Sequence, residues 1–174
     1  KLISHLKSST IKIPSPENRN KDLLKFVSNK YKNIFLSTGA AKISEIKKSV
    51  KYLNKNQVTI MHCVSAYPCD DKNVDLSRIV KLKKITNNIG LSDHSSDILS
   101  CLFSLTHGIS LIEKHFTIDN KLPGRDNKFA ILPSQFLQLK KNIDRYYLMF
   151  QKKNEFFISQ EKEIRNIYTG RWSK

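Results

Sequence analysis

Two histidines occupy matching positions at the ends of two apolar segments. His94 follows the segment 88–91, and His115 closes the segment 110–115. If both segments are parallel strands, their carboxyl ends lie at one edge of the sheet and the two imidazoles can converge. Imidazole nitrogen suits Mn²⁺, Fe²⁺ or Zn²⁺, and a nearby carboxylate such as Glu113 could ligate or orient a bound water. Either histidine alone could be a hydrogen-bonded structural residue. For the pair, spacing alone leaves two interpretations open: a shared divalent ion or two structural histidines.

Further polar residues stand where other apolar segments end. Side chains alternate along a strand, so residues two positions apart share a face. The pairs that share a face in this way are Glu113 with His115, Ser92 with His94, and Ser65 with Tyr67. If the segments are neighbouring strands, these side chains gather into one polar site.

Lys12 is unusual because it lies inside an apolar segment. Burying an ammonium group costs free energy unless it meets an anion, and a phosphate or a carboxylate would serve. Ser15 comes just after this segment and could bind a ligand, or it could cap a helix that carries Pro16 in its first turn. The run 37–39 could likewise be an ordinary turn between a strand and a helix.

The elements that must position these residues follow a regular pattern. Five near-continuous apolar runs are typical of parallel strands that are buried on both faces, and they span 10–13, 33–37, 58–64, 88–91 and 110–115. Amphipathic stretches with helical spacing separate them. The strands recur every 22 to 30 residues, the period of repeated βα units.

Five βα units fit either an open sheet or part of a (β/α)₈ barrel. No GxGxxG motif follows a predicted strand, so nothing supports a dinucleotide-binding sheet. Five units cannot close an eight-stranded barrel, which takes about 250 residues. The chain begins at Lys1 rather than methionine. We therefore expect a longer protein, in which residues 1–150 are the last five units of a TIM barrel and 151–174 are a terminal helix and linker.

Composition limits the other classes of function. The net charge of +16 suggests nucleic acid or an anionic surface, but the lysines are scattered and no arginine stripe alternates with aromatics. We expect a basic solvated surface without specific nucleic-acid or membrane binding. Cys63, Cys69 and Cys101 lack metal-type spacing and are interpreted as reduced thiols of a cytoplasmic protein, with Cys63 in the core. His62 and His107 are interpreted as structural.

Five motifs, taken together and in this order, resemble the N-acetylneuraminate synthase family, which includes the legionaminic and pseudaminic acid synthases. They are KIPSPEN (12–18), FLSTG (35–39), HCVSAYP (62–68), GLSDH (90–94) and IEKHFT (112–117). The spacing between GLSDH and IEKHFT is specific, whereas KIPS or FLSTG alone would be weak. The resemblance extends over residues 10–131.

This resemblance implies an enzyme that condenses phosphoenolpyruvate with an N-acylated amino sugar, forming a sialic-acid-type product and releasing phosphate. It implies a (β/α)₈ barrel and a homodimer, with the first three barrel units and a small C-terminal antifreeze-like domain outside this chain. The metal would be Mn²⁺, held by His94 and His115. The implied substrate contacts are Lys12, Ser15, Ser65 and Ser92 for phosphoenolpyruvate, and Tyr67 and Asp126 for the sugar. Glu113 and Lys12 are the implied catalytic residues.

Three positions depart from the family pattern. Ser65 stands where some members have asparagine, Pro14 replaces a glycine, and Asn127 replaces a histidine. These changes affect the expected sugar more than the expected reaction. Three alternatives stay open: an inactive truncated barrel, a basic module that binds anions, and another metal-dependent aldolase or phosphoenolpyruvate-condensing enzyme. We also expect the 174-residue chain to be inactive by itself.

Overall fold

The computed structural model describes residues 8–54, 57–151 and 157–172. Two regions named in the sequence analysis therefore lie outside the described residues. One is the start of the chain at Lys1. The other comprises residues 152–156 and 173–174 of the predicted terminal segment.

Five strands form one parallel sheet in which spatial order follows sequence order. They are β1 (Thr10–Ile13), β2 (Asn33–Ser37), β3 (Val58–Cys63), β4 (Ile89–Asp93) and β5 (Leu111–Lys114). The first two coincide with the predicted segments. β4 extends two residues beyond its predicted end, because Ser92 and Asp93 continue the ladder opposite Glu113 and Lys114 of β5. An apolar run therefore marks the buried part of this strand but not its polar end.

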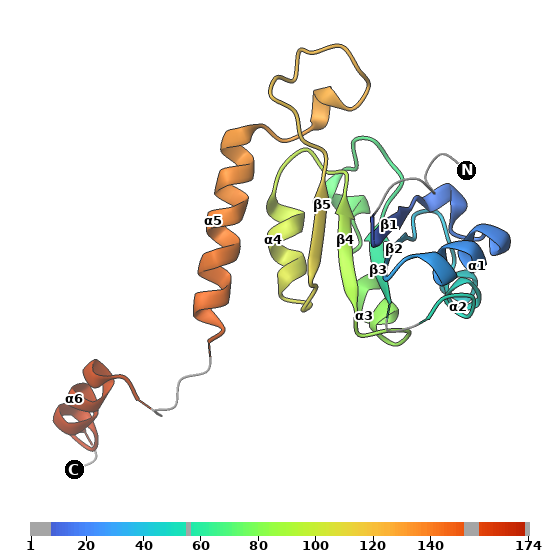
Figure 1. The fold of residues 1–174 in the computed structure, drawn as a ribbon. Helices are drawn as coiled ribbons and strands as arrows, with labels where there is room; N and C mark the ends of the chain where they lie inside the picture. The colour runs from blue at the N-terminus through green and yellow to red at the C-terminus, as the bar shows by residue number, and fades with distance from the viewer. Residues whose placement is uncertain (1–7, 55–56, 152–156, 173–174) are drawn as a thin grey trace. The chain divides into compact units, whose positions relative to one another are not determined.

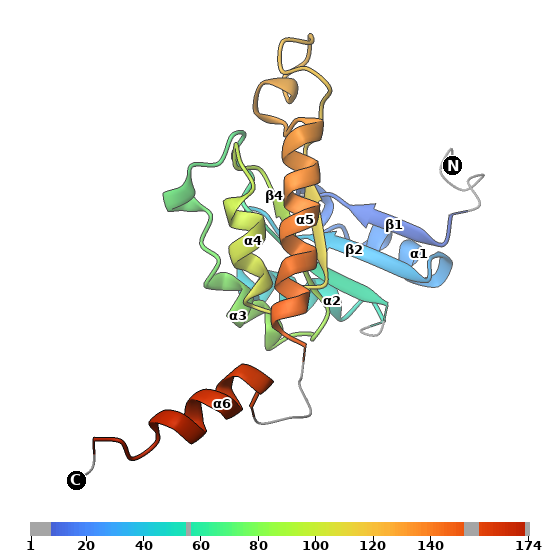
Figure 2. The same cartoon turned by 90° about the vertical axis from the view of Figure 1, so that its left-hand side faces the viewer.

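Helices alternate with the strands, as Figures 1 and 2 show. Between and after the strands come α1 (Lys21–Lys30), α2 (Ile43–Val50), α3 (Arg78–Lys83), α4 (Leu99–Leu105) and α5 (Pro133–Met149). The Asn20 side chain caps α1 by accepting a hydrogen bond from the backbone N–H of Leu23. Leu24 and Val27 of α1 are fully buried and share one face of that helix. α1 thus buries one apolar face, while α3 and α4 contact the central strands β3 and β4.

The sheet is strongly curled. β1 and β5 are its two edges, yet Lys12 of β1 forms an ion pair with Glu113 of β5. Neighbouring strands lie about 4.8 Å apart, so a flat sheet of five would separate its edges by about 19 Å, too far for these side chains to meet. The five βα units therefore form a half-barrel with a concave inner face, and the predicted partial TIM-barrel fold is confirmed.

β4 lies unusually close to its neighbours at Gly90. A Cβ atom at this position would come within 2.4 Å of the Met61 sulfur and 2.9 Å of the Leu111 carbonyl oxygen. Glycine is therefore required by close packing on both sides of the strand. This packing holds the GLSDH segment firmly between β3 and β5.

The chain divides into two compact units, one ending at Ile143 and the other beginning at Asp144. The second unit contains the end of α5 and the helix α6 (Ser159–Tyr168), which lies in the predicted terminal segment. Ile164, Ile167 and Tyr168 of α6 are exposed. Among the helices that the structure describes, none combines the length and apolarity needed to cross a membrane.

Candidate active site

A cavity of about 870 Å³ opens at the carboxyl ends of the strands. Its size is within the usual range for small-molecule sites. Strand-end residues form one part of its lining: Lys12, Tyr67, His94, Glu113, Lys114 and His115. The loop that follows β5 supplies the rest: Gly124, Arg125, Asp126, Asn127 and Phe129. Six of the sequence-predicted site residues line this cavity: Lys12, Tyr67, His94, Glu113, His115 and Asp126. Ser15, Ser65 and Ser92 are not among its lining residues.

His94 and His115 lie on the same side of the sheet, with ring centroids 5.3 Å apart. His94 Nδ1 is 2.7 Å from the carbonyl oxygen of Val64. A carbonyl only accepts hydrogen bonds, so this nitrogen carries the proton and leaves the Nε2 lone pair free when the ring is neutral. His115 Nδ1 lies 3.5 Å from Asp126 Oδ2. The two rings thus lie close together, and the Nε2 atom of neutral His94 is available as a metal ligand.

Protein ligands beyond this pair are scarce in the described part of the chain. No group of three or more His, Cys, Asp or Glu residues there could enclose a metal ion. Two imidazoles with open coordination positions would leave room for water or a substrate oxygen. That arrangement suits a catalytic ion better than a purely structural one.

The pKa values of the two histidines are shifted in opposite directions. Burial opposes protonation of His94, but its contacts with the Cys63 thiol and the Val64 carbonyl outweigh this and raise its pKa. Burial lowers the pKa of His115, and the nearby His94 lowers it further, against the opposing effect of Asp126. A lowered pKa favours neutral His115, the form that binds metal.

Lys12 finds the anion that its position in an apolar strand requires. Its ammonium group pairs with Glu113 Oε2, which also accepts a hydrogen bond from Ser92 Oγ at 2.6 Å. Burial opposes ionisation of Glu113, but the hydrogen bonds from Lys12 and Ser92 outweigh it and lower its pKa. Both charged side chains keep more than a third of their surface exposed, so an incoming anion can reach Lys12.

A second, smaller cavity of about 150 Å³ adjoins Ser15, Gly39 and Ser65. Gly39 N donates to Ser15 Oγ at 3.0 Å, and Ser15 Oγ approaches the Cys63 sulfur at 3.5 Å. Ser15 does not cap a helix, because it is the first residue of a short 3₁₀ turn whose cap position is Pro14. Its hydroxyl instead contacts the end of β2 and the end of β3.

Tyr67 and Asp126 border the histidine pair. The Tyr67 ring centroid lies 4.2 Å from that of His94 and 6.0 Å from that of His115. Burial raises the pKa of Tyr67, so its hydroxyl keeps its proton near neutral pH. The two side chains present a phenol and a carboxylate beside the imidazoles, groups that can hydrogen-bond a polyhydroxylated ligand.

Comparison with known proteins identifies the family. Residues 1–155 match the model of the NeuB family. The chain belongs to the NeuB family. The resemblance that the five motifs predict is thereby confirmed.

Individual relatives agree with this assignment. An uncharacterized protein of Methanocaldococcus jannaschii is 32% identical over 167 residues, which are 94% of this chain and 50% of that protein. The N,N'-diacetyllegionaminic acid synthase of Campylobacter jejuni is 35% identical over 144 residues, which are 79% of this chain and 43% of the synthase. The NeuB-family chain thus spans about half the length of the curated relatives it matches.

A solved structure matches the fold of this NeuB-family chain. It is the N-acetylneuraminic acid synthetase of Leptospira borgpetersenii in complex with citrate. The TM-score is 0.82 at 31% sequence identity, and the match covers 97% of this chain and 61% of that one. The half-barrel therefore has the architecture of part of a sialic acid synthetase.

Sequence reasoning missed two features of this NeuB-family site. Cys63 is buried as expected, but its sulfur lies within 4.0 Å of His94 Nδ1 rather than in a purely apolar core. Burial raises the pKa of this thiol, but the contacts with His94 and Ser15 outweigh that effect and lower it overall. Its position two residues before Ser65, on the same face of the chain, was the available signal.

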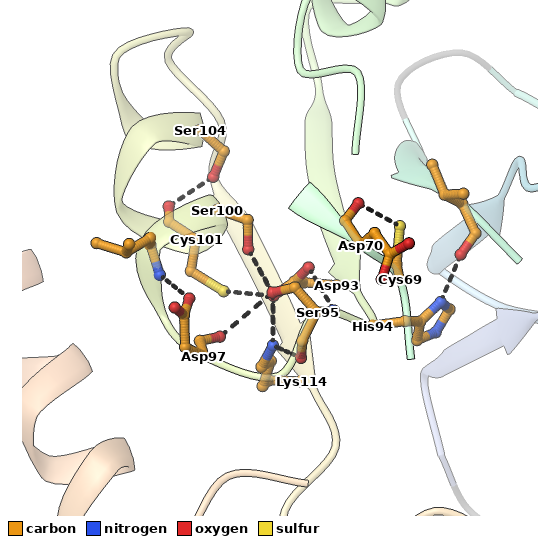
Figure 3. Close-up of polar contacts among 12 residues, drawn as sticks. Cys69, Asp70, Asp93, His94, Ser95, Asp97, Ser100, Cys101, Ser104 and Lys114 are labelled. Carbon is orange, nitrogen blue, oxygen red and sulfur yellow. Dashed lines mark hydrogen bonds and ion pairs between the residues drawn. The ribbon is translucent and has the colours of Figure 1, made fainter. Parts of the chain in front are cut away.

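The second missed feature is a buried ion pair between Asp93 and Lys114 (Figure 3). Burial opposes ionisation of Asp93, but the hydrogen bond and charge of Lys114 outweigh it and lower its pKa. The desolvation argument that singles out Lys12 applies equally to Lys114, which also lies in an apolar strand. Applied to Lys114, it would have predicted a buried carboxylate partner.

Proposed function

We propose that the protein containing this NeuB-family chain condenses phosphoenolpyruvate with an N-acylated amino sugar, forming a nonulosonic acid and releasing phosphate. The observation that carries the proposal is the convergence of His94, His115, Lys12 and Glu113 on one cavity. A pair of imidazoles beside a lysine supplies groups suited to a metal-activated carbonyl and to an anionic co-substrate. Family membership supports a synthase of this type.

The proposed chemistry joins carbon 3 of phosphoenolpyruvate to the aldehyde carbon of the open-chain sugar, whose oxygen takes up a proton. Water then adds at carbon 2 of the former enol phosphate, and phosphate leaves. A divalent ion held by His94 and His115, for which we propose Mn²⁺, would act as a Lewis acid on the sugar carbonyl. The rest of the site binds, orients and neutralises charge.

Lys12 would exchange its contact with Glu113 for the phosphate or carboxylate of phosphoenolpyruvate. Ser15, Ser65 and Ser92 would add hydrogen bonds to that anion, and such charge-assisted contacts stabilise it by positioning and electrostatics. Glu113, released from Lys12, would orient the attacking water or accept its proton. Lys12 and Glu113 line the larger cavity, and Ser15 and Ser65 line the smaller one, which supports these roles.

Tyr67 and Asp126 would bind the sugar on the histidine side of the cavity. The three departures from the family pattern, at Pro14, Ser65 and Asn127, lie in or beside the segments that supply these contacts. We infer that they bear on which amino sugar is accepted rather than on the reaction. We further propose that the protein is cytoplasmic, which agrees with the three free cysteines. We also propose that it is a homodimer, as the resemblance to the family implies.

The test is phosphate release from phosphoenolpyruvate in the presence of N-acetylated amino sugars and Mn²⁺. The assay uses the 174-residue chain and a completed barrel, in which the N-terminal half of a curated relative is joined to it. We expect sugar-dependent phosphate release from the completed barrel and none from the chain alone. Release without sugar dependence, or no release from either form, would contradict the proposed condensation. Release by the chain alone would contradict only its expected inactivity.

Two alternative functions can be tested with the same two protein preparations, because each predicts a different result. Consumption of pyruvate without phosphate release would indicate a metal-dependent aldolase on the same barrel. Retention on DNA that weakens steeply as salt rises would indicate a basic anion-binding module, since phosphate contacts release counterions.

Gly39 offers a test of the phosphoenolpyruvate contacts proposed for Ser15 and Ser65 at the smaller cavity. A Cβ atom at this position would lie 2.1 Å from Ser65 Oγ and 2.8 Å from Ser15 Oγ, so a methyl group must displace both hydroxyls. In the completed barrel we expect Gly39→Ala to raise the KM for phosphoenolpyruvate about tenfold, the value of one charge-assisted hydrogen bond. The KM for the sugar should change less than threefold.

The control for this prediction is Ala41→Gly, a change in the same turn that removes a methyl group instead of adding one. Steady-state kinetics with each substrate varied separately distinguish the two effects. An equal rise in both KM values for Gly39→Ala would mean that the serines do not form a phosphoenolpyruvate subsite.

A further inference from the structure

A buried ion pair lies directly behind the two histidines. Asp93 ends β4 and Lys114 ends β5, and the two residues are partners in the parallel ladder. Their side chains are 2% and 3% exposed, and Lys114 Nζ lies 2.5 Å from Asp93 Oδ2. Side chains alternate along a strand, so the residues that follow, His94 and His115, face the other way. Figure 3 shows the His94 ring pointing away from the pair.

Lys114 contacts the chain on both sides of His94. Besides the carboxylate of Asp93, its ammonium group binds the backbone carbonyl of Ser95 and lies 3.1 Å from Ser95 Oγ. The turn is closed from within as well, because Ser95 N donates to Asp93 Oδ1 at 3.1 Å. The Lys114 side chain therefore holds residues 93–95, which are the last residue of β4 and the two residues after it, including His94.

The carboxylate of Asp93 ties this segment to the next helix as well. Its Oδ2 atom accepts from Ser95 Oγ at 2.9 Å, from Ser100 Oγ at 2.7 Å and from Cys101 Sγ at 3.4 Å. Ser100 and Cys101 belong to α4. The end of β4, the end of β5 and the start of α4 are thus joined at one buried carboxylate.

Backbone hydrogen bonds tie each histidine to another segment but not to the other histidine, because the carbonyl oxygens of His94 and His115 accept from Cys69 N and Ile131 N, each at 2.9 Å. The β4–β5 ladder ends at the pair Asp93 and Lys114, and His94 and His115 follow immediately after it. Beyond that point no backbone hydrogen bond in the described part of the chain joins the two strand ends to each other, whereas the Lys114 side chain contacts both Asp93 and Ser95. A buried ion pair is commonly no more stabilising than apolar residues of the same volume, so stability alone does not require charges here. Paired charges do, however, serve to hold the ends of two strands in one specific arrangement.

We propose that the Asp93–Lys114 ion pair positions the two imidazoles, setting the separation and orientation of the His94 and His115 rings. Asp93 and Lys114 are positioning residues, since neither needs to touch substrate or metal. The catalytic consequence rests on the proposed function, but the placement of the rings does not. The proposal can therefore be tested in metal-free protein.

The decisive variant is the double substitution Asp93→Asn with Lys114→Met, which removes both buried charges and leaves no unpaired ion. The readout is the set of histidine side-chain signals in ¹H–¹⁵N spectra of the metal-free protein. We expect the His94 and His115 ring signals to move or broaden, while those of His107 keep their positions. A folded double variant with His94 and His115 signals at the wild-type positions would overturn the proposal.

A titration with Mn²⁺ provides the second readout. The wild type is expected to bind, His115→Ala to lose binding, and the double variant to bind at least about tenfold more weakly, as found when groups that orient metal ligands are removed. Leu24→Ala is the matched control, because it destabilises a buried site in α1 without touching either strand end, and it should bind like the wild type. A double variant that recovers stability and wild-type affinity together would show a purely structural role and overturn the proposal.

The two readouts separate this inference from the proposed function. If the wild type fails to bind Mn²⁺ while the ring signals of the double variant still move, the metal assignment fails and the positioning role stands. If Mn²⁺ binds through His115 but the ring signals and the affinity of the double variant equal those of the wild type, the metal assignment stands and the positioning role fails. Should Asp93→Asn alone not fold, the double variant still decides between them.

Discussion

Replacing His115 with alanine lowers the kcat/KM of the completed barrel by about a thousandfold, equivalent to about 4 kcal/mol of transition-state stabilisation. The reason is that His115 is one of the two imidazoles that line the cavity among the described residues, and a carbonyl-activating ion would lose one of these two nitrogen ligands. His94→Ala should have an effect of the same size. Because both changes remove one shared function, the double variant should be little worse than either single variant.

The measurement is the rate of phosphate release with saturating and with limiting sugar, for each variant purified in the same way. His107→Ala serves as the control, since this histidine does not line the cavity, and its rate should stay within twofold of the wild type. Wild-type turnover by His115→Ala would refute the metal assignment. A large loss in His107→Ala would show that the assay reports general destabilisation.

Asp93→Asn lowers the free energy of unfolding by about 3–5 kcal/mol, because it leaves the Lys114 ammonium buried without its counter-ion. The substitution keeps the size of the side chain, so the loss comes from charge and not from a cavity. Adding Lys114→Met should recover most of the loss, since the double variant contains neither charge. The coupling between the two sites is therefore large.

Urea unfolding monitored by circular dichroism measures these differences, provided that the slope of the transition is the same in all variants. Ser104→Ala is a suitable control, because its hydroxyl bonds only a backbone carbonyl within α4 at 2.6 Å. It should cost no more than about 1 kcal/mol. A loss below 1 kcal/mol in Asp93→Asn would mean that Lys114 finds another partner or reaches solvent.

Much of the fold follows from local pattern. The runs at 10–13 and 33–37 match β1 and β2, although β1 is an edge strand in which Ile13 is buried and Lys12 is exposed. The ends of β4 and β5 were harder to predict. Asp93 belongs to β4 although it is charged, since its ladder partner Lys114 neutralises it in the buried interior.

The placement of the histidines was also accessible from sequence. His94 and His115 each follow a strand by one residue, and parallel strands in register bring such positions to the same edge. The alternation of side chains then places Ser92 and Glu113 on the face that the two histidines share. The 2.6 Å hydrogen bond between Ser92 and Glu113 follows that expectation.

The sequence by itself determined the repeated βα units, their parallel order and the residues at the carboxyl ends of the strands. These features depend on hydrophobic periods of two and 3.6 residues, which each segment of the sequence contains by itself. Only the tertiary structure decided which charges meet. Lys12 and Glu113 are 101 positions apart and pair because the sheet curls. Asp93 and Lys114 pair because the strands β4 and β5 end in register. Curvature and register arise from packing summed over the whole sheet, so no single segment encodes them.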